Sequence, residues 1–587
     1  MDIFTITLIV SIIAFVAIGN YAGRQVRNLD DYYVAGRRAP TLMIVGTLVA
    51  SLFSSTIFMG EAGFTYDGQM GPYLLFPALA GSGYVYGALL FGRYLRRSKA
   101  ITVAQYFGQR FDSRPIQQVS GLIIIFALGL YLLVVTQGAG LLLVELTQLS
   151  YIEALVIAWI SYTLFTLYAG SKGVVLTDTV MFVLFAVATI AFGSYIIADL
   201  GGVRSAIEAM AQIDQKPLIA SWHGTVGEGY YWLTGLDYLI WAVTIDLAWS
   251  VVYAVSPWQA SRHMMARNEH VVIRAAVWAC LAIIVLQTFI YGLGGLINLY
   301  NPDIVPSETV LIWAAQNLVP DVLGALLLAG IMAAALSSAS TFLSLVGFSA
   351  SNDIWPSGTA VSLATSRMIV FAVSIAVLGA SFYFPPEIFW LVVFVGTLFA
   401  SSWGPVALMS VWSSKITSRA ALWGMITGFV VNLGLSVLEY FEQLSFAHYF
   451  SPTIIATLIS LATIIVLSRI GKVSAAEAEY RTRLHIVPPS DRDRAATRWT
   501  LAGPIALIIY GVTIPFVMLY FYVIPYQTGA GQLAADGGVN WRTGEALVTL
   551  AGPVLYIGLG LFSYWLVKRD YGAAEPAHAP SEERSAP

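Results

Sequence analysis

The sequence is poor in charged residues, which make up only 11% of its 587 residues and leave a net charge of −3. Soluble globular domains carry about 25% charged residues, so a water-soluble protein of this length is excluded. The chain has no basic tract and no nucleic-acid-binding motif, and no nucleic-acid partner is expected. Hydrophobic residues reach 58% instead, which is typical of a membrane protein.

Cysteine and histidine are also scarce. The single cysteine, Cys280, excludes a disulfide within the chain, and the six histidines lack ligand spacing, so no Cys/His metal cluster is expected. We find no nucleophile–base set and no phosphate loop, so an enzyme is not predicted. The first apolar run precedes the first basic residue, Arg24, unlike a cleaved signal peptide. We interpret this run as a retained transmembrane helix.

Long apolar segments fill most of the chain. A span needs about 20 mainly apolar residues, and about fifteen segments meet this requirement. Because each segment must close its own backbone hydrogen bonds in lipid, all are predicted to be α-helices. The predicted spans are residues 3–23, 41–65, 71–95, 117–146, 152–169, 174–199, 236–258, 272–299, 320–350, 363–385, 387–413, 418–440, 452–470, 500–525 and 545–567.

Lys and Arg gather in alternate loops. The loop after the first span holds four Arg residues and residues 471–499 hold six basic residues, whereas residues 300–319 and 441–451 hold none. Basic loops stay in the cytoplasm. The pattern therefore predicts a multi-pass protein of the plasma (inner) membrane, with its N-terminus outside and its C-terminus cytoplasmic.

Asp178 in VVLTDTVMFVLF and Asp246 in IWAVTIDLAWSVVYAVSPWQ lie within predicted spans. Intramembrane charges are costly and usually functional. Two structural interpretations stay open. Asp178 could cap a helix start beside Thr177, and Asp246 could face a wet vestibule or a neighbouring helix.

The ninth span contains the cluster SSxST. Ser337, Ser340 and Thr341 lie at i, i+3 and i+4, so they share one helix face, and Ser338 lies beside them. Hydroxyl and carbonyl oxygens suit a hard cation such as Na⁺. Small residues also allow close helix packing, and taken alone the cluster favours that interpretation.

The second and seventh spans have features of broken helices. A polar stretch, residues 51–56, lies in the middle of the second span, and Ser256-Pro257 interrupts the seventh. A helix broken at the midplane frees carbonyls for cations. The two spans lie about five apart, as expected if two inverted five-helix repeats occupy spans 2–11.

Together these segments resemble the sodium/solute symporter family. NLDDYYVAGRRAPTLMIVGTLVASLFSSTIFMG resembles its first loop and broken helix, GVVLTDTV its Thr-Asp helix, and AGIMAAALSSASTFLSLVGFSASNDIW its sodium-site helix. The resemblance implies an all-α integral membrane protein with a LeuT-type five-plus-five inverted repeat, in about fifteen helices. It also implies a secondary active transporter that performs sodium-coupled symport of a small organic solute by alternating access.

The resemblance implies a division of the chain as well. Residues 1–470 form the symporter core, residues 471–499 a basic cytoplasmic loop, and residues 500–567 two additional transmembrane helices. Residues 568–587 form an Ala/Pro/Glu-rich tail that is expected to be disordered. Apart from the lipid bilayer and the solute, no obligatory partner is expected.

The family resemblance also implies sodium ligands, for one or two ions. The first set is the backbone carbonyls of Ala50 and Phe53 with Ala334, Ser337 and Ser338. Members that transport sialic acid have a second site, whose ligands would here be Asp178, Ser337, Ser340 and Thr341.

The seventh span of this chain is similar to that of the family members that transport proline. Trp249, Tyr253 and Pro257 fall at i, i+4 and i+8, where these members have substrate-linked residues. An aromatic face offers a small solute a flat apolar wall with a polar handle, although a packing stripe is the alternative. Ser54 and Asp246 complete the predicted substrate-binding residues.

The solute itself is left open by two departures from the proline-transporting pattern. Leu52 replaces an acidic residue of the broken helix, and Val134 lies near a tyrosine position. An amino acid such as proline and a short carboxylate both remain candidates. Two other functions are alternatives: a proton-coupled transporter using Asp178 or Asp246, and a transporter-like solute sensor.

Overall fold

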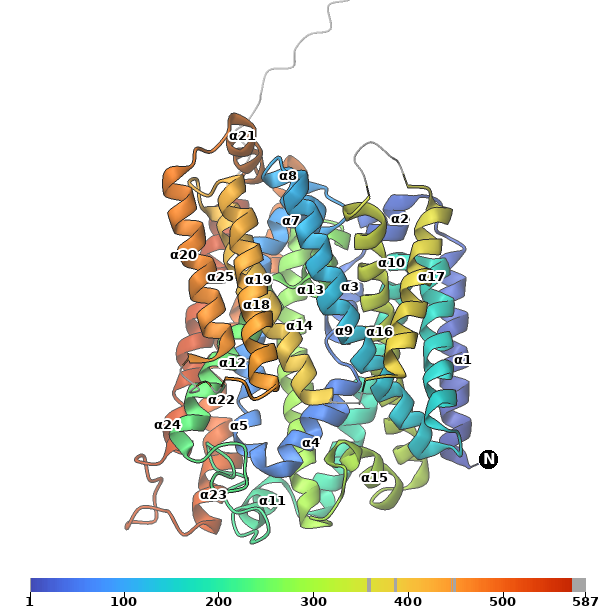
Figure 1. Ribbon diagram of the computed structural model, residues 1–587. Coiled ribbons are helices and arrows are strands. Elements are labelled where there is room, and N and C mark those ends of the chain that lie inside the picture. The colour runs from blue at the N-terminus through green and yellow to red at the C-terminus, as the bar shows by residue number, and fades with distance from the viewer. Residues whose placement is uncertain (1, 356–360, 385–387, 445, 447–449, 573–587) are drawn as a thin grey trace, which may run out of the picture.

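The computed structural model describes residues 2–355, 361–384, 388–444, 446 and 450–572. These residues form a bundle of long helices running between two ends of the molecule (Figure 1). No β-strand forms within these ranges, where a single bridge joins Ala39 to Ala266. Twelve helices in the same ranges are long and apolar enough to cross a membrane. The predicted all-α membrane fold is confirmed. The prediction of a disordered tail from residue 568 is wrong for residues 568–571, which are the last residues of a helix; residues 573–587 lie outside the described ranges.

The first half of the chain contains the first broken span and the longest helices. Apolar runs are helical because lipid offers no other partner to the backbone, and polar caps such as Asp2 and Ser150 mark helix starts. The main helices are α1 (Ile3–Gly23), α2 (Leu29–Val34), α3 (Thr41–Ala50), α4 (Ala62–Phe64), α5 (Met70–Tyr73), α6 (Phe76–Gly87), α7 (Arg93–Ser98), α8 (Val103–Arg110), α9 (Arg114–Leu146), α10 (Tyr151–Asp199) and α11 (Val203–Met210).

The second half repeats the pattern of long, apolar helices with short connections. Its helices are α12 (Gly235–Val255), α13 (Pro257–Met265), α14 (Glu269–Leu296), α15 (Val310–Asn317), α16 (Asp321–Phe348), α17 (Leu363–Ser381), α18 (Ile388–Trp412), α19 (Ser418–Tyr440), α20 (Pro452–Ile470), α21 (Ala475–Leu484), α22 (Arg494–Met518), α23 (Ile524–Gly529), α24 (Gly544–Val548) and α25 (Ala551–Tyr571).

Two predicted spans, residues 152–169 and 174–199, are joined without a loop in α10. Its 49 residues are about 73 Å of helix, more than twice a ~30 Å hydrocarbon layer. The helix is interrupted by a kink at Gly170, where φ is +51° and a Cβ would meet the Tyr32 side chain at 2.4 Å. Only glycine adopts this conformation readily. The connection predicted as a loop is therefore a sharp kink.

Both predicted helix breaks are confirmed. The second span leaves the helix after Ala50 and resumes as a wide π-helical turn, Thr56–Glu61. The seventh span breaks at Ser256, whose ψ of 147° is extended, and continues as α13 from Pro257. A further bend of 77° separates Thr56–Tyr73 from Phe76–Ser98. Breaks at corresponding positions of two repeats are typical of transporters.

The C-terminal helices form a hairpin on the outside of the bundle. α22 and α25 lie side by side, and they pack against α14 and α6 (Figure 1). The N-terminus lies at the opposite end from α21 and α8. The hairpin is therefore an addition to the bundle surface and not part of its centre, which α16 occupies with most of its residues buried.

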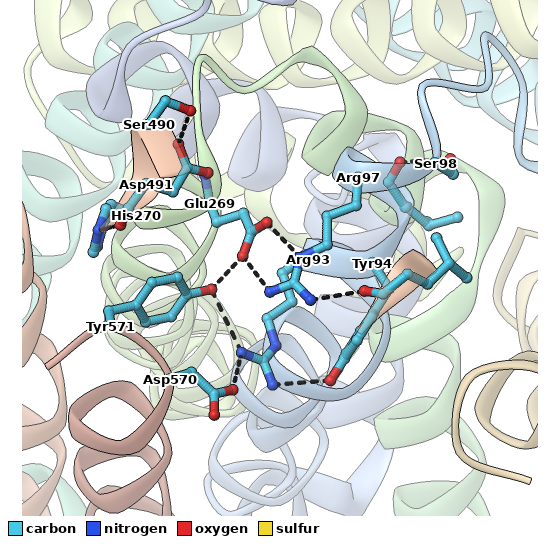
Figure 2. A network of polar contacts seen from close by, with 12 residues as sticks. Arg93, Tyr94, Arg97, Ser98, Glu269, His270, Ser490, Asp491, Asp570 and Tyr571 are labelled. Atoms are coloured by element: carbon cyan, nitrogen blue, oxygen red, sulfur yellow. Dashed lines mark hydrogen bonds and ion pairs between the residues drawn. The ribbon is translucent and has the colours of Figure 1, made fainter. Parts of the chain in front are cut away.

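A buried polar network fastens the end of this hairpin to the core (Figure 2). Arg93 of α7 forms an ion pair with Asp570 of α25 at 2.6 Å. Arg97 binds both oxygens of Glu269, at 2.5 and 2.7 Å, and the Tyr571 hydroxyl donates to the same carboxylate. Charge-assisted, bidentate contacts of this kind fix geometry strongly. The network thus joins α7, α14 and α25 at one end of the bundle.

The same network reaches the connection that precedes the hairpin. Arg97 also donates to the Leu484 carbonyl of α21 at 2.7 Å. The Glu269 amide donates to Asp491 at 3.1 Å, and His270 lies 2.7 Å from the Asp491 carbonyl. Residues 484–491 are therefore held against the start of α14.

We expect Asp570→Asn to destabilise the folded protein by about 1–3 kcal/mol, because the fully buried Arg93 side chain loses its charged partner. The matched control is Glu479→Gln, which breaks an exposed ion pair with Arg483 at 4.0 Å; its expected cost is below about 0.5 kcal/mol. Thermal unfolding of the purified protein in detergent measures both. Equal shifts in the two variants would show that the hairpin does not depend on this network.

Candidate functional site

The break in the second span brings backbone carbonyls to the centre of the bundle. After Ala50 the chain leaves the helix, and the Phe53 amide reaches back to the Val49 carbonyl at 2.9 Å. Ala50 and Phe53 are both fully buried. Their carbonyl oxygens therefore need partners from another element.

The partners are the hydroxyls of α16. Ser337 Oγ lies 2.9 Å from the Ala50 carbonyl and 2.9 Å from the Ala334 carbonyl. Ser338 Oγ lies 2.8 Å from the Phe53 carbonyl and 3.3 Å from that of Ala50. Five oxygens thus converge from two elements far apart in the sequence. A cluster of neutral carbonyl and hydroxyl oxygens is a ligand set for a hard cation such as Na⁺.

A second polar centre lies on the same side of α16. Asp178 of α10 accepts a hydrogen bond from Thr47 at 2.5 Å, and its Oδ2 is 3.6 Å from Arg262 of α13. Arg262 also donates to Thr341. Both charged side chains are buried, and Asp178 Oδ1 has no hydrogen-bond partner in the described structure. The guanidinium group of Arg262 therefore provides a positive charge next to the Asp178 carboxylate.

Ser340 is turned toward its own helix. Its hydroxyl donates to the Ser337 carbonyl at 2.8 Å. In this state Ser340 and Thr341 are therefore engaged within α16 and with Arg262. Of the four residues predicted for a second sodium site, Asp178 and Thr341 both contact Arg262, whereas Ser337 and Ser340 bond to backbone carbonyls.

A narrow cavity lies next to the five-oxygen cluster. Its free volume of about 10 Å³ holds about one water molecule, so a solute fits only after the lining side chains move apart. Leu52, between Ala50 and Phe53 in sequence, forms part of the wall. The lining residues are Leu52, Thr56, Ile57, Glu61, Tyr73, Phe76, Tyr131, Trp249, Tyr253, Phe389, Val392 and Val393.

Two of the predicted substrate-binding residues line this cavity. Trp249 and Tyr253 pack edge to face, with ring centroids 5.7 Å apart. Ser54 lies in the break with its hydroxyl 2.5 Å from that of Thr56, outside the lining. Asp246 and Pro257 also lie outside it, and the binding roles of all five predicted residues stay predictions.

Three site residues were missed by the sequence reasoning. Glu61 is an acidic residue within the second predicted span, so the rule used for Asp178 and Asp246 would also have found it. Tyr131 lies one helix turn before Val134 and puts a tyrosine in the cavity wall after all. Arg262 follows the break in the seventh span and was assigned to a loop, so its burial beside Asp178 was not predictable.

Comparison with known proteins gives consistent matches. A profile of the Sodium:solute symporter family matches residues 32–428. The chain is 27% identical to a Sodium/proline symporter of Salmonella typhimurium, over 83% of this chain and 97% of that protein. It is 24% identical to a Sodium/pantothenate symporter of Haemophilus influenzae, over 74% of this chain and 89% of that protein.

Solved structures with the same fold include two transporters. One is a Na⁺-coupled sialic acid symporter in a substrate-bound outward-open state, with a TM-score of 0.67, 18% identity, and coverage of 81% of this chain and 99% of that one. The other is Mhp1, a nucleobase-cation-symport-1 family transporter in a closed conformation, with a TM-score of 0.51, 14% identity, and coverage of 77% and 98%. The likeness confirms the LeuT-type fold.

Proposed function

The chain belongs to the sodium:solute symporter family, and we propose that its coupling sodium binds where the broken second span meets α16. It is a multi-pass membrane transporter and not an enzyme, and it couples Na⁺ to the transport of a small solute. The proposed position of the sodium site rests on one observation: the Ser337 and Ser338 hydroxyls both donate to carbonyls of residues at the helix break. A cation that binds there holds α16 to the second span.

One sodium ion per cycle is the stoichiometry that we assign to this site. The charge of Asp178 is offset by Arg262, whose Nη2 lies 3.6 Å away, so Asp178 does not need a second cation. A membrane potential contributes about 2.3 kcal/mol per elementary charge per 100 mV. With an electroneutral solute, one sodium ion would therefore add about 50-fold accumulation per 100 mV.

The solute binds, in this proposal, in the cavity beside the sodium. Leu52 lies between two sodium ligands in sequence and also lines the cavity, so filling either site constrains the same stretch of backbone. Coupling requires that each ligand favours the state that binds the other. The cavity is nearly closed, and opening it toward either side in turn gives alternating access. The candidate solutes are an amino acid such as proline and a short carboxylate.

The orientation follows from the distribution of basic residues. Arg93, Arg97 and Arg110 lie at the end of the bundle that carries α21, and basic ends face the cytoplasm. We therefore assign the N-terminus to the outside and the C-terminus to the cytoplasm of the plasma membrane. Residues 1–470 form the transporting core, and the hairpin of residues 500–567 is an addition to it.

Uptake of labelled solutes into proteoliposomes tests the proposal. The panel comprises proline, pantothenate and short carboxylates, with an inward gradient of sodium or of choline. We expect accumulation of one solute with sodium only. Equal uptake in choline at a fixed proton gradient would favour the proton-coupled alternative. Saturable binding without transport would favour the solute sensor.

Trp249→Ala should raise the solute concentration for half-maximal uptake about tenfold or more, because a buried Trp side chain supplies 3–5 kcal/mol of packing. The half-saturating sodium concentration should change much less, since Trp249 supplies none of the five oxygens of the proposed sodium site. Trp423→Ala, which removes an exposed Trp on α19, is the control. An unchanged solute half-saturation in Trp249→Ala would mean that Trp249 only packs.

A further inference from the structure

Glu61 is the charged residue of the solute cavity. It ends the π-helical turn Thr56–Glu61 that resumes the broken span, and among the described residues that line the cavity it alone carries a formal charge. The neighbouring residues Ile57 and Phe58 are fully buried, whereas Glu61 is partly exposed and lines the cavity. The carboxylate therefore faces the space in which the solute binds.

The structure gives Glu61 a hydrogen bond but no counter-ion. The Tyr291 hydroxyl of α14 donates to its Oε2. In the ranges that the structure describes, every ion pair joins other residues, and the buried Arg262 is directed to Asp178 and Thr341. An uncompensated carboxylate within the membrane is strongly disfavoured unless a cation or a proton joins it. A cationic partner for Glu61 would therefore have to come from outside the protein.

We propose that Glu61 binds a positively charged nitrogen of the transported solute. The solute class is then an amino-bearing compound, a zwitterionic amino acid or a small amine, and a simple monocarboxylate is excluded because it would meet a like charge. The inference rests on the proposed function, since it takes this cavity as the solute site.

The rest of the cavity suits such a group. Aromatic faces attract cations, and Trp249, Tyr131 and Phe389 surround the cavity from three helices. Tyr291, by donating to one carboxylate oxygen, leaves the other oxygen of Glu61 to accept from an ammonium group. A charge-assisted hydrogen bond in a site shielded from water is among the stronger polar contacts.

The test uses solute pairs that differ only in the amino group. We measure uptake by the wild-type protein under an inward sodium gradient. The labelled pairs are proline with cyclopentanecarboxylate and alanine with propionate, and pantothenate is added as a carboxylate without an amino group. Glu61→Gln, Glu61→Asp and, as a control, Asp214→Asn in an exposed loop are then compared with the best-transported solute. The wild-type comparison needs no variant, so the test survives poor folding of Glu61→Gln.

We expect only amino-bearing members to be accumulated, and their deaminated counterparts not to compete. Glu61→Gln should raise the solute KM about tenfold or more, and the half-saturating sodium concentration should stay unchanged. Glu61→Asp keeps the charge and should restore part of the solute affinity. The control Asp214→Asn should match the wild type. Sodium-driven uptake of propionate, cyclopentanecarboxylate or pantothenate overturns the inference and leaves the proposed function standing. Sodium-independent uptake of the amino members overturns the proposed function and leaves the inference standing.

The two other roles open to a cavity carboxylate give different results. A sodium ligand would show a raised half-saturating sodium concentration in Glu61→Gln with an unchanged solute KM. A coupling proton carrier would show solute uptake that follows a proton gradient in choline and is lost in Glu61→Gln. Either result overturns the assignment of Glu61 to the solute.

Discussion

Ser338→Ala should raise the sodium concentration for half-maximal transport at least about tenfold, because it removes one of five oxygens around the proposed ion. In the structure Ser338 Oγ lies 2.8 Å from the Phe53 carbonyl and 3.3 Å from the Ala50 carbonyl. Losing this hydroxyl leaves the break in the second span less tightly bound to α16. The solute KM at saturating sodium should stay near its wild-type value, since Ser338 lies outside the cavity lining.

Ser344→Ala provides the matched control for this experiment. Ser344 lies on the same helix and is buried to a similar degree, but its hydroxyl donates to the Ser340 carbonyl of its own turn, at 2.8 Å. The change therefore removes a buried hydroxyl without touching the broken span. Sodium-dependent uptake by the two variants, over a range of sodium concentrations, separates the two roles. If both variants respond to sodium alike, the hydroxyls of α16 serve packing and not ion binding.

Arg262→Leu should abolish most transport or folding, because it leaves the Asp178 carboxylate buried without a charged partner. Removing one member of a buried ion pair typically costs about 3–5 kcal/mol. The pair is fully buried, with an N–O distance of 3.6 Å, and Thr47 is the other polar contact of Asp178. The double variant Asp178→Asn with Arg262→Leu removes both charges, so it should recover part of the loss.

A double-mutant cycle of thermal stability and uptake measures this coupling. An interaction above about 0.5 kcal/mol between the two positions is expected for residues in contact. Additive losses would mean that Arg262 does not compensate Asp178. If Asp178 held a second sodium, Asp178→Asn would raise the half-saturating sodium concentration, and removing Arg262 would lower it by freeing the carboxylate. These outcomes decide whether one or two sodium ions take part.

Much of the fold was predictable because it depends on local composition. Apolar runs of sufficient length have no alternative to helix in lipid, and the Pro at position 257 and the polar stretch at 51–56 mark breaks that the structure contains. The first set of sodium ligands came from a family resemblance, and the structure brings all five residues together. Their role as ligands remains a proposal.

What escaped prediction depends on contacts between distant residues. The approach of Arg262 to Asp178 joins positions 84 apart in the chain, and the sequence of α13 alone resembles a basic loop. The kink at Gly170 replaces a loop because glycine permits φ of +51° where Tyr32 leaves no room for a Cβ. Glu61 could be recognised from the sequence as an acidic residue within a predicted span. Its place in the cavity wall depends on how the chain continues after the break in the second span.

The most direct test of sodium coupling at the α16 junction is to measure both fluxes in the same vesicles. Radioactive sodium and the labelled solute are followed into proteoliposomes that contain wild-type protein or Ser338→Ala. We expect sodium influx that rises with solute at a fixed ratio of about one to one, and a shift of both fluxes to higher sodium in the variant. Solute accumulation without accompanying sodium influx, or a variant with wild-type sodium dependence, would contradict it.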